Sequence, residues 1–265
     1  MTTRKRIAKA VADVTGSASA RGPWGDFPVV NILASLGDMR LHPRYEAAKN
    51  GDAAAAYKIV RQIEARATRS WAESVRTMLG GARPALVPVQ GINTLERPRV
   101  NLLPGALATV LGAALELPVD REIFKVSTFS RTDFKGWPRI ALPPKFTGQL
   151  VQPARGALMV DDAITQGGTL ASLRAWLEAQ GAHVAGAVAL TDKPNLATLA
   201  LQPDNLKALR GRYAKIENWW IATLGYGFDR LTESEAQYLL KHRTGPHAVR
   251  NRISQCLRTA GTRGN

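Results

Sequence analysis

Residues 158–169 read LMVDDAITQGGT, and this stretch decides the fold. The run that leads into it, GALMV at residues 156–160, is short and uncharged, which predicts a strand buried on both faces. Residues 169–181 (TLASLRAWLEAQG) are helical in pattern and end at a glycine. Two acids and two glycines separate the strand from the helix. This order predicts a loop at the carboxyl edge of a parallel sheet, where open α/β folds bind ligands.

The residue types of this loop suit a phosphorylated sugar. Gly167 and Gly168 let the backbone approach a ligand closely, and the first turn of the next helix offers unpaired N–H groups and a positive dipole end. Two threonine hydroxyls add hydrogen-bond donors, and the carboxylates of Asp161 and Asp162 suit the hydroxyls of a ribose. We therefore expect phosphate contacts from Ala163, Ile164, Thr165, Gln166, Gly167, Gly168 and Thr169.

Strand and helix patterns alternate around this loop. Residues 84–89 (PALVPV), 122–129 and 183–191 predict further strands, and residues 103–117 predict a helix. The alternation indicates a parallel α/β sheet. We expect four parts along the chain: a mobile basic N-terminus (1–26), a helical N-terminal addition (27–83), the core (84–193) and a helical basic C-terminal addition (194–265).

Other stretches carry local signals for helices and loops. Asp52 and Ser70 are typical N-cap residues and are expected to begin two helices of the N-terminal addition. Residues 130–148 are rich in Pro, Lys and Arg and are expected to form a loop. From residues 196–201 (LATLAL) onward, the chain is expected to be mostly helical.

Residues 158–169 resemble the donor-binding motif of type I phosphoribosyltransferases. Counted from Ala157, the shared order is four apolar residues, two acids, two apolar residues, Thr, a variable position, Gly, any residue and Thr. Ala163 departs from it where a larger aliphatic residue is usual, and Gln166 departs where Thr or Ser is usual. The resemblance covers residues 84–193, and the flanks resemble a poorly characterised group of bacterial phosphoribosyltransferases. The alternative is a Rossmann-like loop in which the acid pair occurs by chance.

The resemblance implies a parallel-sheet type I phosphoribosyltransferase core with helical additions that form a hood. It also implies a homodimer, the donor 5-phosphoribosyl 1-diphosphate with Mg²⁺, and a nucleobase-type acceptor. Asp161 and Asp162 would be the catalytic pair and would hold the metal indirectly, through ribose hydroxyls or water. The implied pyrophosphate contacts are Gln90, Arg97, Arg99 and Asn101; those of the flexible loop are Ser127, Arg131 and Lys135; and that of the base is Lys193.

Thr165 bears on the identity of the acceptor. Members that use 6-oxopurines usually carry an aspartate at this position, placed to handle a proton of the base. Thr165 has no such acid–base capacity near neutral pH, which disfavours hypoxanthine and guanine. Adenine, orotate, uracil-type and unusual acceptors stay open.

The net charge of +15 is unevenly distributed. Residues 1–83 hold 14 basic against 7 acidic side chains, and residues 201–265 hold 11 against 5. Basic ends suit a polyanion, so a second hypothesis is a regulator that senses the donor and binds nucleic acid. In that case Trp219 and Trp220 could stack on bases; otherwise they are one core and one surface aromatic. A degenerate partner subunit is a third possibility.

Cysteine content and hydropathy bear on the compartment. Cys256 is the only cysteine, so an internal disulfide is excluded and a reducing compartment is favoured. The four histidines show no clear metal-ligand spacing, and no stretch approaches the ~20 apolar residues of a membrane span. We expect a cytoplasmic protein without membrane contact. An organelle transit peptide is the alternative interpretation of the basic start.

Overall fold

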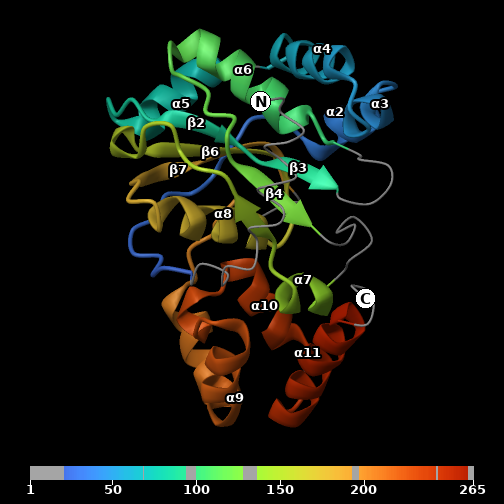
Figure 1. The fold of residues 1–265 in the computed structure, drawn as a ribbon, viewed down its shortest axis with the longest axis vertical. Helices are drawn as coiled ribbons and strands as arrows, with labels where there is room; N and C mark the ends of the chain where they lie inside the picture. The colour runs from blue at the N-terminus through green and yellow to red at the C-terminus, as the bar shows by residue number, and fades with distance from the viewer. Residues whose placement is uncertain are drawn as a thin grey trace.

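The computed structural model describes residues 21–67, 69–93, 100–127, 136–192, 197–242 and 244–261. Strands lie between helical layers, and a separate group of helices follows at the C-terminal end (Figure 1). The strands are β1 (Asn31–Ile32), β2 (Ala85–Pro88), β3 (Gln90–Asn93), β4 (Phe124–Ser127), β5 (Lys145–Thr147), β6 (Ala157–Ile164) and β7 (Val184–Asp192). The helices are α2 (Leu36–Arg40), α3 (Tyr45–Lys49), α4 (Ala53–Glu64), α5 (Trp71–Leu79), α6 (Leu103–Leu115), α7 (Trp137–Ala141), α8 (Gly168–Glu178), α9 (Pro203–Leu224), α10 (Glu233–Lys241) and α11 (Pro246–Gly261), with 3-10 turns at Pro153–Arg155 and Phe228–Arg230.

The main sheet has the order β1-β7-β6-β2, and all its neighbours are parallel. After Val89 the chain continues from β2 into β3, which belongs to a second sheet of order β3-β4-β5. In that sheet β3 pairs parallel with β4, and β5 returns antiparallel. The predicted parallel α/β sheet is therefore confirmed, and the carboxyl ends of β6 and of β2–β3 lie at one edge.

Strand β6 is buried on both faces because helices cover both sides of the main sheet (Figure 1). Leu158 and Val160 face a core formed with α4, α5 and α6. Ala157 and Met159 face a second core formed with α8. This alternation explains the charge-free run seen in the sequence, since neither face of the strand meets water.

A third core lies in the helical lobe, which consists of α7, α9, α10 and α11 (Figure 1). Its centre is aromatic: Trp220, Tyr213 and Phe228 are fully buried and meet edge to face. Helix α7 comes from the middle of the chain and packs against α11. The lobe thus joins a core segment to the C-terminal addition.

Most predicted elements are present, and four differ. The helix cap of Asp52 is confirmed by its bond from the Ala55 N–H at 2.9 Å, and that of Ser70 by its bond from the Glu73 N–H at 3.3 Å. Residues 197–202 were expected to be helical, but they run without helix before α9. The expected loop at 130–148 contains α7 and β5 in its described part.

The other two differences concern β6 and the N-terminal addition. Strand β6 continues four residues beyond the predicted strand end, because residues up to Ile164 pair with β7. The N-terminal addition is not purely helical, since it supplies the edge strand β1, paired with β7. Helices α4 and α5 also share the core of α6. This segment is therefore built into the sheet layers. None of the helices within the described residues combines the length and apolar composition needed to cross a bilayer.

A buried ion pair joins the start of the described chain to the helical lobe. Arg21 Nη1 lies 2.6 Å from Glu235 Oε2 and its Nη2 lies 3.1 Å from Oε1, with side-chain exposures of 4% and 1%. The Glu235 carboxylate also accepts the Thr232 N–H at 3.0 Å, which completes the capping box of α10. Breaking such a pair leaves a charge without compensation in a medium of low dielectric constant.

We predict that Glu235→Gln lowers the free energy of unfolding by about 3–5 kcal/mol, because Arg21 keeps its charge and loses its buried partner. Urea denaturation measures the change. Glu64→Gln is the matched control, since its pair with Arg61 lies at the surface and should contribute less than about 1 kcal/mol. Equal effects of the two substitutions would contradict a structural role of the buried pair.

Candidate functional site

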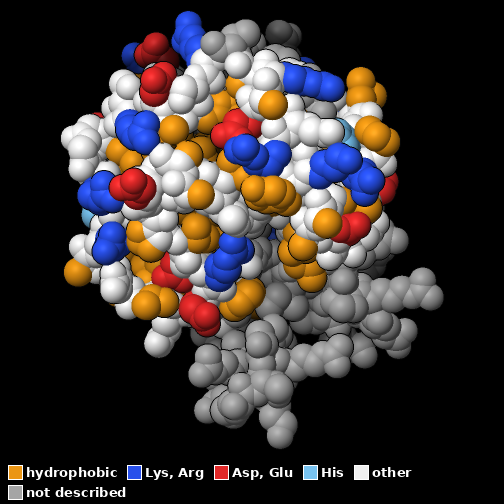
Figure 2. All heavy atoms as spheres, turned by 90° about the horizontal axis from the view of Figure 1, so that it is seen from above, with side chains coloured by type: hydrophobic (Ala, Val, Ile, Leu, Met, Phe, Trp, Pro, Cys, Tyr) orange, Lys and Arg blue, Asp and Glu red, His pale blue; other side chains and the backbone are white. Residues whose placement is uncertain are grey.

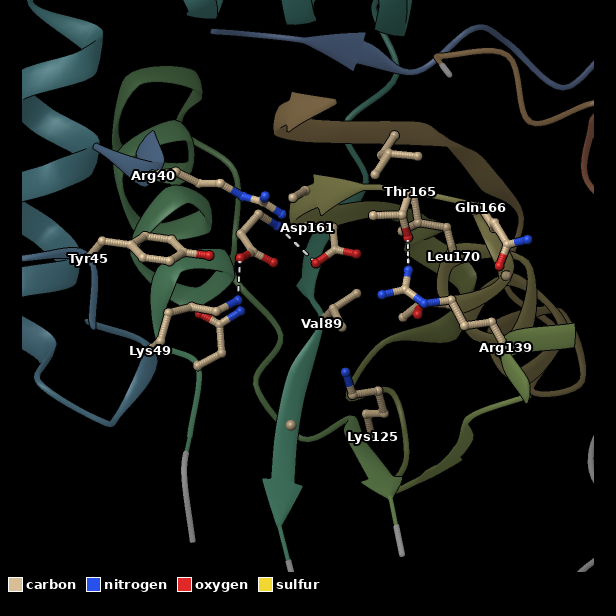
Figure 3. Close-up of a pocket in the computed structure, with 18 of the residues that line it drawn as sticks. Arg40, Tyr45, Lys49, Val89, Lys125, Arg139, Asp161, Thr165, Gln166 and Leu170 are labelled. Atoms are coloured by element: carbon tan, nitrogen blue, oxygen red, sulfur yellow. Dashed lines mark hydrogen bonds and ion pairs between the residues drawn. The ribbon is translucent and has the colours of Figure 1, made fainter. Parts of the chain in front are cut away.

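A cleft of about 420 Å³ lies at the edge of the sheet where β6 ends (Figure 3). The predicted loop forms one wall, and its residues from Ala163 to Thr169 all line the cleft. Helices α2 and α3 form the opposite wall. Lys125 on β4 and Arg139 on α7 complete the lining. The predicted phosphate-binding residues are therefore brought together around one cavity.

The acid pair forms the floor of this cleft. Asp161 and Asp162 are only 7% and 6% exposed. The Asp161 carboxylate accepts the N–H of Asp162 at 2.8 Å, and the Asp162 carbonyl accepts the Thr191 hydroxyl at 3.2 Å. Because both residues lie in β6, their positions are fixed by pairing with β7 and do not depend on a loop.

The two carboxyls have different electrostatic environments. Burial, together with the neighbouring charge of Asp162, raises the pKa of Asp161 to about 8. Burial acts in the same direction on Asp162, but Lys49 and hydrogen bonds from Asp161 and Asn101 hold its pKa below the usual range. Near neutral pH the pair therefore shares one proton and carries a single negative charge.

Lys49 at the end of α3 is the cationic partner of this pair. Its Nζ lies 2.8 Å from Asp162 Oδ2. Burial is the largest single effect and disfavours its charge, but the charge and hydrogen bond of Asp162, with Tyr45 and Asp161, together outweigh burial and raise its pKa. The ammonium is also 5.7 Å from the ring centre of Tyr45. Lys49 therefore stays protonated inside the cleft.

The loop is shaped by its contacts with the helical lobe. Gly167 has φ of +73°, and a Cβ added there would lie 2.4 Å from Leu199 Cδ2. A Cβ on Gly168 would lie 2.6 Å from a Glu235 oxygen. Thr232 donates its hydroxyl to the Gln166 carbonyl at 2.5 Å. These glycines were expected to allow close approach of a ligand, but packing against Leu199 and against Thr232 and Glu235 of the lobe also requires them.

The N-terminus of α8 faces the cleft beside this loop. Gly167 is its N-cap, and no side chain within the described chain caps the helix. Backbone N–H groups at such an end, together with the helix dipole, form an anion site. Arg139 reaches the same wall and donates to the Thr165 hydroxyl, while burial lowers its pKa. This end of the cleft therefore suits a phosphate.

The other predicted site residues have different outcomes. Asn101 lines the cleft, hydrogen-bonds Asp162, and accepts the Leu103 N–H at 3.2 Å. Gln90 does not line it, because its neighbours Val89 and Gly91 face the cavity and its own amide donates to the Arg121 carbonyl at 3.2 Å. Ser127 was expected in a flexible loop but is the last residue of β4. Arg97, Arg99, Arg131, Lys135 and Lys193 lie outside the described residues.

Several lining residues were missed in the sequence, among them three cations and a tyrosine. Arg40, Tyr45 and Lys49 come from the N-terminal helices, and Lys125 from β4. Their side chains point into the cavity in Figure 3. Lys49 ends a helix directly before Asn50, where a solvated lysine is ordinary. No local signal in the sequence distinguishes it from such a residue.

The carboxylates of the cleft decide whether it can hold a divalent cation. Within the described residues no cluster of three or more His, Cys, Asp or Glu side chains could enclose a metal. Mg²⁺ commonly binds through one or two carboxylates together with substrate phosphates and water. Asp161 and Asp162 fit an ion that arrives with a phosphorylated ligand.

Comparison with known proteins adds two relatives. No protein-family model matches the chain. It is 35% identical over 250 residues to Protein TraN of Escherichia coli, an alignment that covers 93% of this chain and 54% of TraN. It is 36% identical over 158 residues to an uncharacterized protein of Haemophilus influenzae, which covers 59% of this chain and 34% of that protein. The chain thus spans about half of TraN and about a third of the other relative.

We predict that Asp161→Asn stabilises the protein increasingly as pH rises. The folded-state pKa of about 8 lies above the ordinary value of about 3.9. The folded protein disfavours the ionised form of Asp161, so its free energy of unfolding falls as pH rises from about 4 to about 8. Above pH 8 the full loss applies. The variant avoids this cost and should gain on wild type by about 1 kcal/mol per pH unit between pH 5 and pH 8, and by no more above that range.

Urea unfolding at several pH values, without divalent cations, measures this difference. Asp26→Asn, at an exposed turn, is the matched control. If the difference in unfolding free energy between Asp161→Asn and wild type did not change with pH, Asp161 would ionise in the ordinary range.

Proposed function

We propose that this protein is a phosphoribosyltransferase of the type I class that works in the cytoplasm. It binds 5-phosphoribosyl 1-diphosphate in the cleft and transfers phosphoribose to a nucleobase-type acceptor. One arrangement of residues carries the proposal. A buried acid pair lies near the end of a parallel strand, and a glycine loop and a helix N-terminus without a side-chain cap follow it along the chain. Cationic side chains surround this segment. Because neither the family models nor the relatives' names support this class, the proposal rests on the motif and the cleft.

The parts of the cleft match the parts of the donor in order. The N-terminus of α8, with Arg139 beside it, suits the 5-phosphate. Asp161 and Asp162 suit the ribose hydroxyls, since a protonated carboxyl can donate and an ionised one can accept. Asn101 and the cations beyond the acid pair lie where the diphosphate would extend.

Positioning and charge contribute most of the catalysis in this proposal. Displacement of diphosphate from the anomeric carbon builds positive charge on the ribose ring, and the single negative charge of the acid pair stabilises it. Asp161 and Asp162 would hold Mg²⁺ through ribose hydroxyls or water. When bound, the ion would neutralise charge on the departing diphosphate.

Thr165 disfavours 6-oxopurines as acceptors, for the reason already given by the sequence. Its hydroxyl accepts from Arg139 and belongs to the phosphate end of the cleft. It supplies neither an acid nor a base for a 6-oxopurine. Adenine, orotate and uracil-type bases are therefore the first acceptors to test.

The structure offers less support to the regulatory hypothesis. Trp220 is fully buried in the helical lobe, and the ring of Trp219 is covered by Arg250 at 5.4 Å. Trp220 is therefore not available for stacking on bases, and the half-buried ring of Trp219 is already in contact with Arg250. On the face over α4–α6, Lys and Arg side chains are spread among acidic and apolar ones and do not form a continuous patch (Figure 2).

We predict that Asp161→Asn together with Asp162→Asn abolishes donor binding. The pair loses its single negative charge while its shape is kept, and each side chain offers the ribose hydroxyls one acceptor oxygen in place of two. Calorimetry with the donor and Mg²⁺ measures the affinity, and pyrophosphate release with a panel of bases identifies the acceptor. Asp26→Asn is the control. Unchanged affinity in the double variant would refute the site, and release with no base in the panel would leave a donor-binding protein without transferase activity.

We predict that Arg139→Gln weakens ribose 5-phosphate binding about tenfold or more. A charge-assisted hydrogen bond to phosphate contributes about 1.5–3 kcal/mol. Calorimetric titration with ribose 5-phosphate measures the change. Lys145→Gln on the neighbouring strand β5 removes an exposed cation outside the cleft and should leave the affinity within about twofold. An equal loss in both variants would indicate non-specific attraction.

A further inference from the structure

Lys49 is held in place by its backbone. The preceding residue, Ala48, is fully buried, and its carbonyl accepts the Leu102 N–H at the start of α6 at 3.2 Å. The end of α3 is therefore attached to the residue before α6, next to Asn101, which hydrogen-bonds Asp162. The side chain of Lys49 is 28% exposed, and its ammonium points into the cleft (Figure 3). It differs in this respect from a mobile surface lysine.

Cations lie on both sides of the acid pair. In Figure 3, Arg40 and Lys49 approach from the side of α2 and α3, while Arg139 approaches from the side of the glycine loop. The acid pair carries one negative charge near neutral pH, and Lys49 already balances it. Of the other acidic residues in the lining, Glu235 is paired with Arg21, and Glu46 lies on α3, on the same side as Arg40 and Lys49. Both sides of the cleft thus present cationic side chains to a bound ligand.

We propose that Lys49 binds the diphosphate group of the donor. Its ammonium bridges Asp162 and a diphosphate oxygen and forms a second anion position opposite the N-terminus of α8. This inference rests on the proposed function and deepens it: a residue of the N-terminal helices, outside the phosphoribosyltransferase-like motif, recognises the leaving group.

The chemistry of the ammonium allows this bridge. An ammonium has three N–H donors, and Asp162 takes one of them. Asp162 also has a hydrogen bond from Asn101, so its charge stays compensated when Lys49 is shared. Arg40 lies on the same side and can take a further oxygen of the diphosphate. A ligand with a phosphate at only one end would leave this position empty.

Two probes separate the two anion positions. Ribose 5-phosphate carries only the group that suits the α8 end, and inorganic pyrophosphate with Mg²⁺ carries only the group that suits Lys49. We expect Lys49→Gln to weaken pyrophosphate binding about tenfold or more and to leave ribose 5-phosphate within about twofold. Lys49→Arg should restore most of the loss, since the charge returns. Lys58→Gln, on the exposed side of α4, is the matched control.

The calorimetric outcomes distinguish the two proposals. Equal loss of both probes in Lys49→Gln, or loss of neither, overturns the role of Lys49. If wild type binds ribose 5-phosphate and not pyrophosphate, this inference fails while the phosphate and ribose site stands. If wild type binds neither probe, the proposed function fails as well.

A measurement on the wild-type protein covers the case in which Lys49→Gln does not fold. Reductive methylation followed by peptide mass spectrometry reports the reactivity of each lysine. We expect pyrophosphate with Mg²⁺ to slow labelling of Lys49 severalfold and ribose 5-phosphate to leave it unchanged. Labelling of Lys58 should not respond to either probe. Protection of Lys49 by both probes equally, or by neither, overturns the inference.

Discussion

Burial of two adjacent carboxyl groups at the end of β6 is the constraint on which the site depends. Helices cover both faces of this strand, so the charge on Asp161 and Asp162 has little water to stabilise it. The protein meets this cost in two ways, by keeping one carboxyl protonated and by placing Lys49 against the other. The N-terminal helices thereby become part of the cleft, because they carry the compensating charge.

The sequence predicted the layers better than it predicted the boundaries between parts. Buried parallel strands have a strong signature, and the runs that contain β2, β6 and β7 were found for that reason. The division into core and additions was less informative, because it depends on long-range contacts. The pairing of β1 with β7 and the packing of α7 on α11 bring together segments far apart in the chain, and no local pattern encodes such pairs.

The same distinction applies to the cleft. Residues of one continuous segment, from Asp161 near the end of β6 to Thr169 at the start of α8, line one cavity as predicted, since a strand–loop–helix unit has a nearly fixed geometry. Residues that reach the cleft from other elements were harder to find. Asn101 was identified, Gln90 was placed on the wrong face of its strand, and Lys49 was missed because a lysine at a helix end is common at any surface.

The glycine loop takes its shape from the helical lobe behind it. Leu199, Thr232 and Glu235 fill the space that side chains at Gly167 and Gly168 would need, and Arg139 from α7 bonds to Thr165 in front. The loop needs these contacts to keep its form. The sheet and its first helices, expressed without the lobe, would therefore not form the loop correctly. A chimera that exchanged the lobe with that of a distant relative would have to carry over this small set of residues, or the loop would lose its form.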